Sequence, residues 1–459
     1  MKFIDLFSGI GGYDLGIERA RMSNKPFYPI FLAPVPVLSL LALNVLQIHS
    51  LSGLRFALGS LLIAGAALGL LGIALGRNWH RAALIVALML ILWHLYRVLV
   101  WWSWIPVLGL ATWLIIKTNP GIRFAKYANF ISLWTLIFVI GVIGFYAGRR
   151  DWIRYDPSFT HQTQEGPPRP DIYFIILDSY TDHAVLLSHF GYDNTAFLDD
   201  LGALGFIIGE CESPYGSTEL SLAATLNPGL DILPDGGNPL WYLIRHSQTR
   251  ATLEGRGYQM ITFATGFVWS EIMDSDYYYR PSWLTGQLTD FEIFYLGQTP
   301  LDLVIVNLID LDSNLGDLYR SRTLLILDHL PDAATMPGPQ FTFAHIIQPH
   351  PPFVFSELGG PADWAAYVNP DYSHPGAIVT EYLKEDYIQG YIMQARYIES
   401  AILPRLSAII EADPEAVVIL AGDHGPWYSE SEHQSRAILC ATYGADFPDP
   451  IMVFSEVIK

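Results

Sequence analysis

The sequence predicts an N-terminal bundle of about five membrane-spanning helices, followed by an α/β domain with a largely parallel central sheet. Residues 27–148 are almost continuously apolar, and 51% of the chain is hydrophobic while only 15% is charged, which is too apolar for an ordinary soluble enzyme. After residue 170, apolar strand segments alternate with helical segments. In one sheet, that alternation favours right-handed parallel crossovers.

Five apolar segments separated by short charged turns are the candidates for membrane-spanning helices. All but the fourth have roughly the ~20 residues that a helix needs to cross a bilayer. Soluble helices keep a polar stripe, and Leu58–Leu75 has none. The five candidates are Phe27–Ile48, Leu54–Gly76, Ala82–Trp101, Trp102–Ile116 and Tyr127–Gly148.

Positive charge predicts the orientation of these helices. With a cytoplasmic N-terminus, the inner segments hold nine Lys and Arg residues, and the outer segments hold four, namely Arg55, Arg149, Arg150 and Arg154. Five spans then place everything after Gly148 outside the cytoplasm, as an extracytoplasmic domain on a multi-pass membrane protein. If the third and fourth candidates form one helix, the domain lies inside instead.

Composition divides the chain into four parts. Residues 1–21 precede a transmembrane domain at 22–150, and residues 151–170 contain a polar, Pro-rich linker, PSFTHQTQEGPPRP. The α/β domain occupies residues 171–459. Its strand candidates are Asp171–Leu177, Gln259–Ala264, Gln340–Ile346 and Ala416–Leu420, and its helix candidates include Asn194–Leu204 and Tyr387–Glu411.

The first stretch, FIDLFSGIGG at residues 3–12, closely resembles motif I of DNA cytosine-5 methyltransferases, which holds S-adenosylmethionine. Neither Cys211 nor Cys440 follows a proline, as the nucleophile of that family does, and we read both as buried small residues. The first apolar span begins about ten residues after Gly16, which leaves no room for a Rossmann-like sheet. A net charge of −19 also argues against a nucleic-acid partner. We therefore expect residues 1–21 to be a foreign leader, with a methyltransferase fragment as the remote alternative.

Two strand ends in the α/β domain carry candidate metal ligands. DIYFIILDSY delivers Asp178 at the C-terminal end of an apolar strand, where α/β folds place their sites. AVVILAGDHGPW ends a second strand with Asp423, His424 and Gly425. A neighbouring carboxylate and imidazole make a good divalent-metal pair, and glycine permits a tight turn around them. The alternative for Asp178 is a helix cap or turn residue.

Thr218 and His350 are the candidates for contact with a substrate. In SPYGSTELSLAATLN, a turn leads to Ser217 and Thr218 and then into a helix, whose N-terminal N–H groups and dipole favour an anionic ester. A hydroxyl there suits a nucleophile, although either residue could simply cap the helix. In HIIQPHPPF, prolines stiffen the loop that holds His350. The alternative is an ordinary surface histidine.

In this order, the motifs resemble the alkaline phosphatase/sulfatase superfamily over roughly residues 22–445, and most closely its membrane-anchored branch of lipoteichoic acid synthases and phosphoethanolamine transferases. The resemblance implies an alkaline-phosphatase-like fold and a divalent metal ion (Zn, Mn, Ca or Mg). It implies that Thr218 is the nucleophile and that His350 contacts the transferred group. The implied metal ligands are Asp178, Thr218, Asp423 and His424, with Asp182, His345 and His374 as extra candidates that no firm motif supports.

The resemblance implies a metal-dependent hydrolase or transferase that acts on phosphate or sulfate esters at the outer face of the membrane. Its partners are then membrane lipids and an anionic ester, such as a lipid headgroup or glycan. The formylglycine route of sulfatases is disfavoured, because the nearest string, Cys211-Glu212-Ser213-Pro214-Tyr215, has its proline one place late and lacks the arginine. Only 36 residues follow Asp423, so we expect a C-terminal truncation. A degenerate, non-catalytic relative is the alternative.

Overall fold

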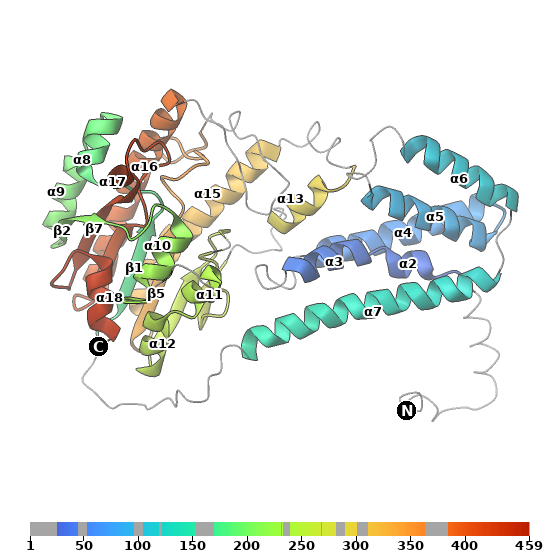
Figure 1. Cartoon of the computed structure of the whole chain (residues 1–459), viewed down its shortest axis with the longest axis horizontal. Coiled ribbons are helices and arrows are strands. Elements are labelled where there is room, and N and C mark those ends of the chain that lie inside the picture. Colours follow the sequence, from blue (N-terminus) through green and yellow to red (C-terminus); the bar gives the residue numbers. More distant parts are fainter. Residues whose placement is uncertain are drawn as a thin grey trace. The chain divides into compact units, whose positions relative to one another are not determined.

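The computed structural model describes residues 25–44, 53–95, 104–118, 122–152, 169–230, 232, 239–267, 269–280, 290–300, 311–362 and 384–458. The expected leader, His374 and most of the Pro-rich linker lie outside these residues. The chain forms two compact units (Figure 1). One comprises Met1–Arg150 with Phe291–Leu308, and the other comprises Asp151–Asp290 with Ile309–Lys459.

The first unit is helical. Its elements are α2 (Tyr28–Leu32), α3 (Val35–Asn44), α4 (Leu54–Ala74), α5 (Trp79–His94), α6 (Trp104–Thr118), most of α7 (Ile122–Trp152) and most of α13 (Asp290–Gly297). Among the described residues, only α4 and the Phe124–Tyr146 part of α7 are long and apolar enough to cross a membrane. The shorter apolar segments have 10–17 residues and are Tyr28–Asn44, Trp79–His94 and Pro106–Lys117. The expected count of about five spans is therefore not confirmed, although apolar helices occur in all five predicted segments.

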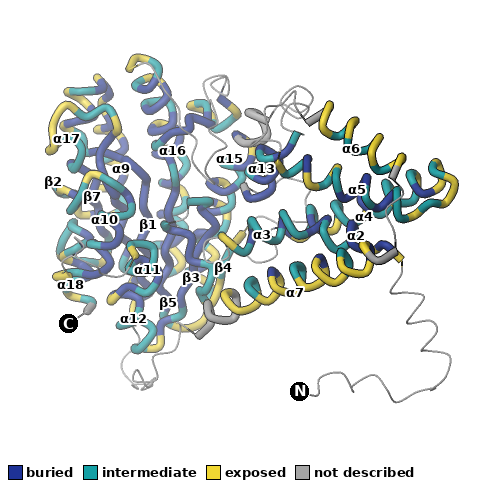
Figure 2. The backbone as a smooth tube through the Cα atoms, turned by 45° about the vertical axis from the view of Figure 1, so that its right-hand side comes forward, coloured by how far each residue is buried: buried dark blue, intermediate teal, exposed yellow. Residues whose placement is uncertain are grey.

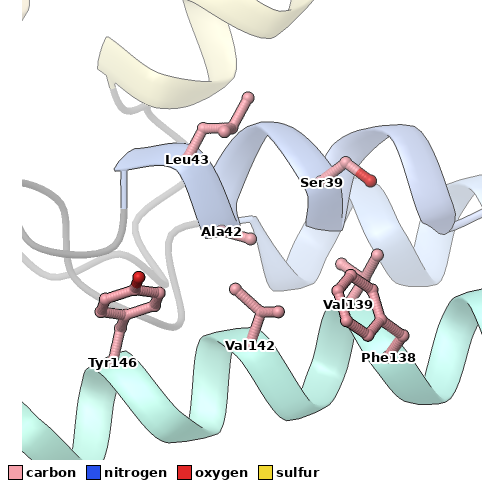
Figure 3. Close-up of a pocket in the computed structure, with 7 residues that line it drawn as sticks. All are labelled: Ser39, Ala42, Leu43, Phe138, Val139, Val142 and Tyr146. Carbon is pink, nitrogen blue, oxygen red and sulfur yellow. The ribbon is translucent and has the colours of Figure 1, made fainter.

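Figure 2 shows many exposed residues along α6 and α7. The exposed large apolar side chains of the helical unit include Leu62 and Ile63 of α4, Leu110 of α6, and Phe130 and Phe138 of α7. Extended apolar surfaces of this kind indicate contact with a membrane or a partner. A cavity of about 620 Å³ lies between α3 and α7. Figure 3 shows Tyr146, Val142 and Val139 of α7 pointing toward α3 there. Most of its lining is apolar, so we read this cavity as a packing feature of the helices.

The second unit is built on a seven-stranded sheet in the order β2-β7-β6-β1-β5-β3-β4. The strands from β6 to β4 pair in parallel, whereas β7 is antiparallel to both of its neighbours. The sheet is therefore mixed, with the expected parallel arrangement at its centre. The strands are β1 (Ile172–Leu177), β2 (Ile207–Glu212), β3 (Gln259–Phe263), β4 (Tyr277–Tyr279), β5 (Gln340–Ile346), β6 (Val417–Gly422) and β7 (Ala437–Tyr443).

Helices cover both faces of this sheet, as the continuous apolar runs of its central strands predict. In β1, alternate residues face opposite cores: Tyr173 and Ile175 join one cluster, while Ile172 and Phe174 join the other. The first face packs against α9 (Thr195–Ala203), α15 (Leu311–His329) and α16 (Lys384–Ala412). The second packs against α10 (Thr218–Thr225), α11 (Leu240–Arg245), α12 (Gln248–Gly255) and α18 (Pro450–Ile458).

Short helical turns complete this unit. They are α8 (His183–Val185), the π-helical η2 (Leu186–Phe190), the 3₁₀ turn η3 (Pro331–Thr335) and α17 (Glu432–Arg436). The α8 and η2 turns follow β1 and precede α9, and η3 follows α15. The last of the four, α17, lies between β6 and β7. The residues of the site motifs lie on or beside the central strands and at the start of α10.

Cys211 and Cys440 form a disulfide bond between β2 and β7, which corrects their interpretation as two separate buried residues. The two strands pair in antiparallel register with Gly209 opposite Cys440. A separation of 229 residues along the chain gave no sign that the strands are neighbours. Structural disulfides are typical of extracytoplasmic proteins.

Replacing both cysteines, as Cys211→Ser with Cys440→Ser, should lower the free energy of unfolding by about 2–4 kcal/mol, because the bond restricts the unfolded chain. Thermal unfolding with and without reductant measures this change. Reductant should destabilise the unaltered chain and leave the double variant unchanged. Free thiols at both cysteines in the denatured, unreduced chain would contradict the bond.

Candidate active site

The predicted metal ligands meet at the C-terminal edge of the central strands. Asp178 follows β1 directly, Asp423 follows β6, and His345 lies near the end of β5. In the parallel register, Ile176 is opposite His345 and Leu177 is opposite Gly422. Because β5, β1 and β6 are neighbours that run in the same direction, their ends deliver these side chains to one place.

Ligand atoms of Asp178, His345 and Asp423 all lie within 4.8 Å of one another, and the three side chains are buried. His345 Nε2 is 3.3 Å from Asp178 Oδ2. His424 joins this group: its Nε2 lies 3.4 Å from Asp178 Oδ1 and 3.8 Å from Asp423 Oδ2. The four side chains therefore form one compact cluster of oxygen and nitrogen donors.

Three atoms of this cluster are buried without a hydrogen bond among the described residues: Asp178 Oδ1, Asp423 Oδ2 and His345 Nε2. Buried polar atoms in native proteins nearly always have a partner, and leaving one without costs free energy. Carboxylate oxygens and imidazole nitrogens converging on one point are ligands that suit a divalent metal ion. The residues present therefore fit the cofactor that the motifs imply.

The charge balance of the cluster also favours a cation. Burial raises the pKa of the Asp178 carboxyl, but His350, His345 and His424 outweigh burial and hold that pKa well below its ordinary value. Burial lowers the pKa of the His424 imidazole, but the Asp423 and Asp178 carboxylates outweigh burial and raise it to about 9. The Asp178 carboxylate is therefore ionised, and it attracts positive charge, either from the His424 imidazolium or from a metal ion that replaces its proton.

Backbone groups orient Asp423 and His424. Asp423 Oδ1 accepts hydrogen bonds from the N–H groups of Ser179 and His424, at 2.9 and 3.0 Å, which leaves Oδ2 for the cluster. His424 Nδ1 donates to the Gly425 carbonyl at 2.6 Å, which directs Nε2 to the cluster. A Cβ atom at Gly425 would lie 2.0 Å from the Gln434 carbonyl oxygen, so glycine is required for the close approach of these two segments.

His345, which the sequence offered only as an extra candidate, lies inside the cluster. Its Nδ1 contacts Ser270 Oγ at 2.7 Å, which turns Nε2 toward Asp178. Ser270 was missed, because a serine in an irregular loop carries no motif. Asp182, another extra candidate, instead caps α8 by accepting a hydrogen bond from Val185 N at 2.8 Å.

The two rival hydroxyls at the start of α10 point to different partners. Thr218 Oγ1 lies 3.1 Å from His424 Nε2, and the Thr218 side chain is buried. Ser217 is the N-cap residue, but its hydroxyl makes no capping bond and instead contacts Glu219 Oε1 at 3.1 Å. Of the two, only Thr218 places its oxygen beside the cluster.

His350 lines a cleft of about 340 Å³ that is also lined by Asp178, Thr218 and His424. Its ring packs edge-to-face against Trp427, with centroids 5.0 Å apart, and its Nδ1 donates to the Pro351 carbonyl at 2.6 Å. These contacts fix the ring and leave Nε2 for another partner. The cleft is lined by Asp178, Gly216, Ser217, Thr218, Glu219, Thr265, Gly266, Phe267, Tyr319, Ile347, His350, Pro351, Pro352, His424 and Trp427.

A second buried acid supports the loop that follows β1. Glu399 of α16 accepts hydrogen bonds at 2.5 Å from the hydroxyls of Tyr180 and Tyr192. Burial raises the pKa of the Glu399 carboxyl to about 7, although both tyrosines and Arg396 lower it. Glu399 therefore links the stability of this loop to pH.

Two comparisons, with protein-family models and with curated proteins, found no match. Solved structures similar to the chain include phosphoethanolamine transferase A, an integral membrane protein of Neisseria meningitidis, at 14% identity and a TM-score of 0.37, covering 94% of this chain and 80% of that one. They also include the periplasmic domain of EptC from Escherichia coli, at 12% identity and a TM-score of 0.37, covering 64% and 77%. A third is the lipoteichoic acid synthase LtaP from Listeria monocytogenes, at 13% identity and a TM-score of 0.37, covering 64% and 69%.

These proteins are members of the alkaline phosphatase/sulfatase superfamily, which the sequence motifs resemble. Likeness at this level does not assign an activity. The functional conclusion therefore depends on the geometry of the cluster.

Between pH 5 and pH 8 the protein should lose stability through Glu399. The pKa of its carboxyl in the folded state, about 7, lies above the ordinary 4.5, so the folded state binds the proton more tightly. The contribution of Glu399 to the free energy of unfolding is fully present below pH 4.5 and disappears as pH rises through about 7. This contribution is at most about 3 kcal/mol. Thermal unfolding across this range should show a flatter profile for Glu399→Gln; parallel profiles would contradict the assignment.

Asp178→Asn should weaken binding of Zn²⁺ or Mn²⁺, because a charged ligand becomes neutral. Loss of a group that only hydrogen-bonds to a metal ligand lowers metal affinity by about 10–100-fold, and we expect at least that loss here. Calorimetric titration of the chelator-stripped full chain measures the affinity. Asp182→Asn is the matched control: it changes the same chemistry at a helix cap and should bind as the unaltered chain does. Equal affinity in all three proteins would exclude the cluster as the metal site.

Proposed function

We propose that this protein is a metal-dependent hydrolase or transferase that acts on phosphate esters, or on sulfate esters, through the hydroxyl of Thr218. The observation that carries the proposal is the position of Thr218 Oγ1, 3.1 Å from His424 Nε2 at the edge of a cluster of buried donors without partners. A hydroxyl in that position suits nucleophilic attack on an anionic ester.

Each residue of the cluster has a part in this chemistry. Asp178, Asp423 and His424 would hold a divalent ion, with Thr218 and His345 beside it, and the ion supplies charge neutralisation and a lowered pKa for the attacking hydroxyl. Thr218 is the first residue of α10, so the positive end of the helix dipole favours both its alkoxide and an anionic group in front of it.

The covalent route conserves atoms and charge. Thr218 gives up its hydroxyl proton to solvent, and Oγ1 attacks phosphorus in line with the leaving oxygen. The bond from that oxygen to phosphorus breaks as the new bond to Thr218 forms, and the leaving oxygen takes up a proton from solvent and departs as the alcohol. Water or an acceptor hydroxyl then attacks the phosphorus of the phospho-threonine and releases Thr218. Attack by water would make the protein a hydrolase, and attack by an acceptor hydroxyl would make it a transferase. His350 offers Nε2 as the contact for the transferred group.

The charges of the side chains that line the cleft support a requirement for a bound metal ion. Among its described residues there is no Lys or Arg, while Asp178 and Glu219 are acidic. An anionic ester therefore needs positive charge from the histidines, the α10 N-terminus and a bound cation. A non-catalytic role is not favoured, because Asp178, Thr218, Asp423 and His424 do converge. A cytosine methyltransferase is not favoured either, since both cysteines are in a disulfide.

We propose further that the chemistry takes place outside the cytoplasm, in a catalytic domain at 171–459 joined by the 151–170 linker to a transmembrane domain at 22–150. The Cys211–Cys440 disulfide supports an oxidising compartment. Two helices of membrane-spanning length and their exposed apolar residues support the membrane assignment. Membrane lipids and a lipid headgroup or glycan ester are the partners that fit this placement.

Thr218→Ala should reduce turnover by roughly 10³-fold or more, since loss of the nucleophile removes the covalent route. Thr218→Ser should retain a substantial part, because it keeps the hydroxyl. Hydrolysis of an aryl phosphate, a phosphodiester and a sulfate ester by the metal-loaded full chain measures this.

Ser217→Ala is the matched control and should remain active, because its hydroxyl contacts Glu219 rather than the cluster. Near-normal turnover in Thr218→Ala with an inactive Ser217→Ala would move the nucleophile one residue back. Near-normal turnover in both would end the proposal of a nucleophilic hydroxyl at this helix.

A further inference from the structure

One segment of the α/β sequence packs within the helical unit. The helix α13 lies between β4 and α15 in the chain, yet its Phe291 and Tyr295 form a buried cluster with Val37, Leu41 and Ala57. A Cβ atom at Gly53 would approach Phe291 Cε1 to 3.0 Å, so α13 lies directly against the start of α4. These contacts join residues more than 200 positions apart.

Two polar contacts give this packing a defined geometry. Arg55 forms a two-pronged ion pair with Glu292, with Nε donating to Oε1 at 2.8 Å and Nη2 donating to Oε2. The Glu292 side chain is 1% exposed and the Arg55 side chain 31% exposed. His94 Nδ1 donates to the Leu90 carbonyl, so Nε2 accepts from the Tyr295 hydroxyl at 2.9 Å. Paired, oriented contacts of this kind select one partner and one register.

The contacts of α13 fall at one end of the helices. Arg55 lies at the start of α4, Leu41 lies close to the end of α3, and His94 is the last residue of α5. The distribution of Lys and Arg predicts that this end faces outward. A segment of an extracytoplasmic domain can therefore reach it without entering the bilayer.

The described residues that precede and follow this segment in the sequence contribute to the wall of the cleft. Upstream, Tyr278 of β4 donates to Glu271, whose carboxylate accepts from the N–H groups of Thr265 and Gly266. Thr265 and Gly266 line the cleft, and Tyr319 of α15, downstream of the segment, lines it as well. The chain that docks on the helices is thus continuous with two parts of the cleft wall.

We propose that α13 is a docking segment that fastens the α/β unit to the helical unit independently of the 151–170 linker, with the Arg55–Glu292 pair as its selective contact. The α/β sequence is then held to the helical unit by the packing of α13 as well as by the linker. This attachment does not require the proposed chemistry, and its test reads no activity.

The test uses the full chain in detergent, with an affinity tag before residue 25 and a protease site inserted between residues 157 and 168. After cleavage of the unaltered chain, the fragment that begins beyond the cut should remain with the tagged helices. Arg55→Ala should reduce the retained fraction about tenfold or more, because it removes the ion-pair partner of a buried carboxylate. Circular dichroism of the uncut variant confirms that it is folded.

Two further variants complete the test. Arg55→Glu combined with Glu292→Arg restores opposite charges and should recover retention, at least in part. Arg396→Ala breaks an exposed pair with Glu357 in the α/β unit and should be retained fully. Separation of the fragments in the unaltered chain, or full retention in folded Arg55→Ala, would overturn the proposal.

Discussion

Two carboxylates buried side by side are the constraint on which the rest of the α/β unit depends. Asp178 and Asp423 follow β1 and β6, which are hydrogen-bonded in parallel, so sheet register fixes the two charges near each other. Ionised groups are costly to bury, and like charges repel. His345, His350 and His424 compensate only in part, since one oxygen of each carboxylate still makes no hydrogen bond within the described residues. The cation that would complete the site would therefore also stabilise the fold.

A single residue, Ser179, holds the two strand ends in position. Its N–H donates to Asp423 Oδ1, its hydroxyl donates to the Gly425 carbonyl at 2.8 Å, and its carbonyl accepts from Tyr391 at 2.8 Å. Ser179 has a φ of 64°, a left-handed conformation that residues other than glycine rarely adopt. Three hydrogen bonds offset such strain, which is common where a site dictates backbone geometry. The loop after β1 is thus shaped by the position of the ligands rather than by local preference.

Sequence reasoning predicted the parts of this protein that depend on local pattern. Apolar runs located β1, β3, β5 and β6, and their ends identified Asp178 and Asp423 as site candidates. The residue pattern alone did not choose between Ser217 and Thr218, because the choice depends on how the first turn of α10 faces His424; the family resemblance selected Thr218. Nor could sequence reasoning find the Cys211–Cys440 bond or the docking of α13, since both depend on which distant segments become neighbours. The number of membrane spans could not be predicted from composition alone. Apolar composition indicates an apolar helix, but the length of that helix in the folded chain decides whether it can cross a membrane.

The disulfide and the α13 contacts both support the proposed position of the α/β sequence outside the cytoplasm, although they arise from unrelated physics. A disulfide persists where the compartment is oxidising, and Cys211–Cys440 lies in the α/β unit. Orientation by charge depends on Lys and Arg in short loops. Arg77 lies in the turn between α4 and α5, and Arg81 lies in the first turn of α5, whereas Arg55 lies at the other end of α4. A segment of the α/β sequence contacts the Arg55 end. With the Arg55 end outside, as the distribution of charge predicts, a cytoplasmic α/β unit would require α13 to cross the bilayer with Glu292, and a carboxylate is costly to move through hydrocarbon.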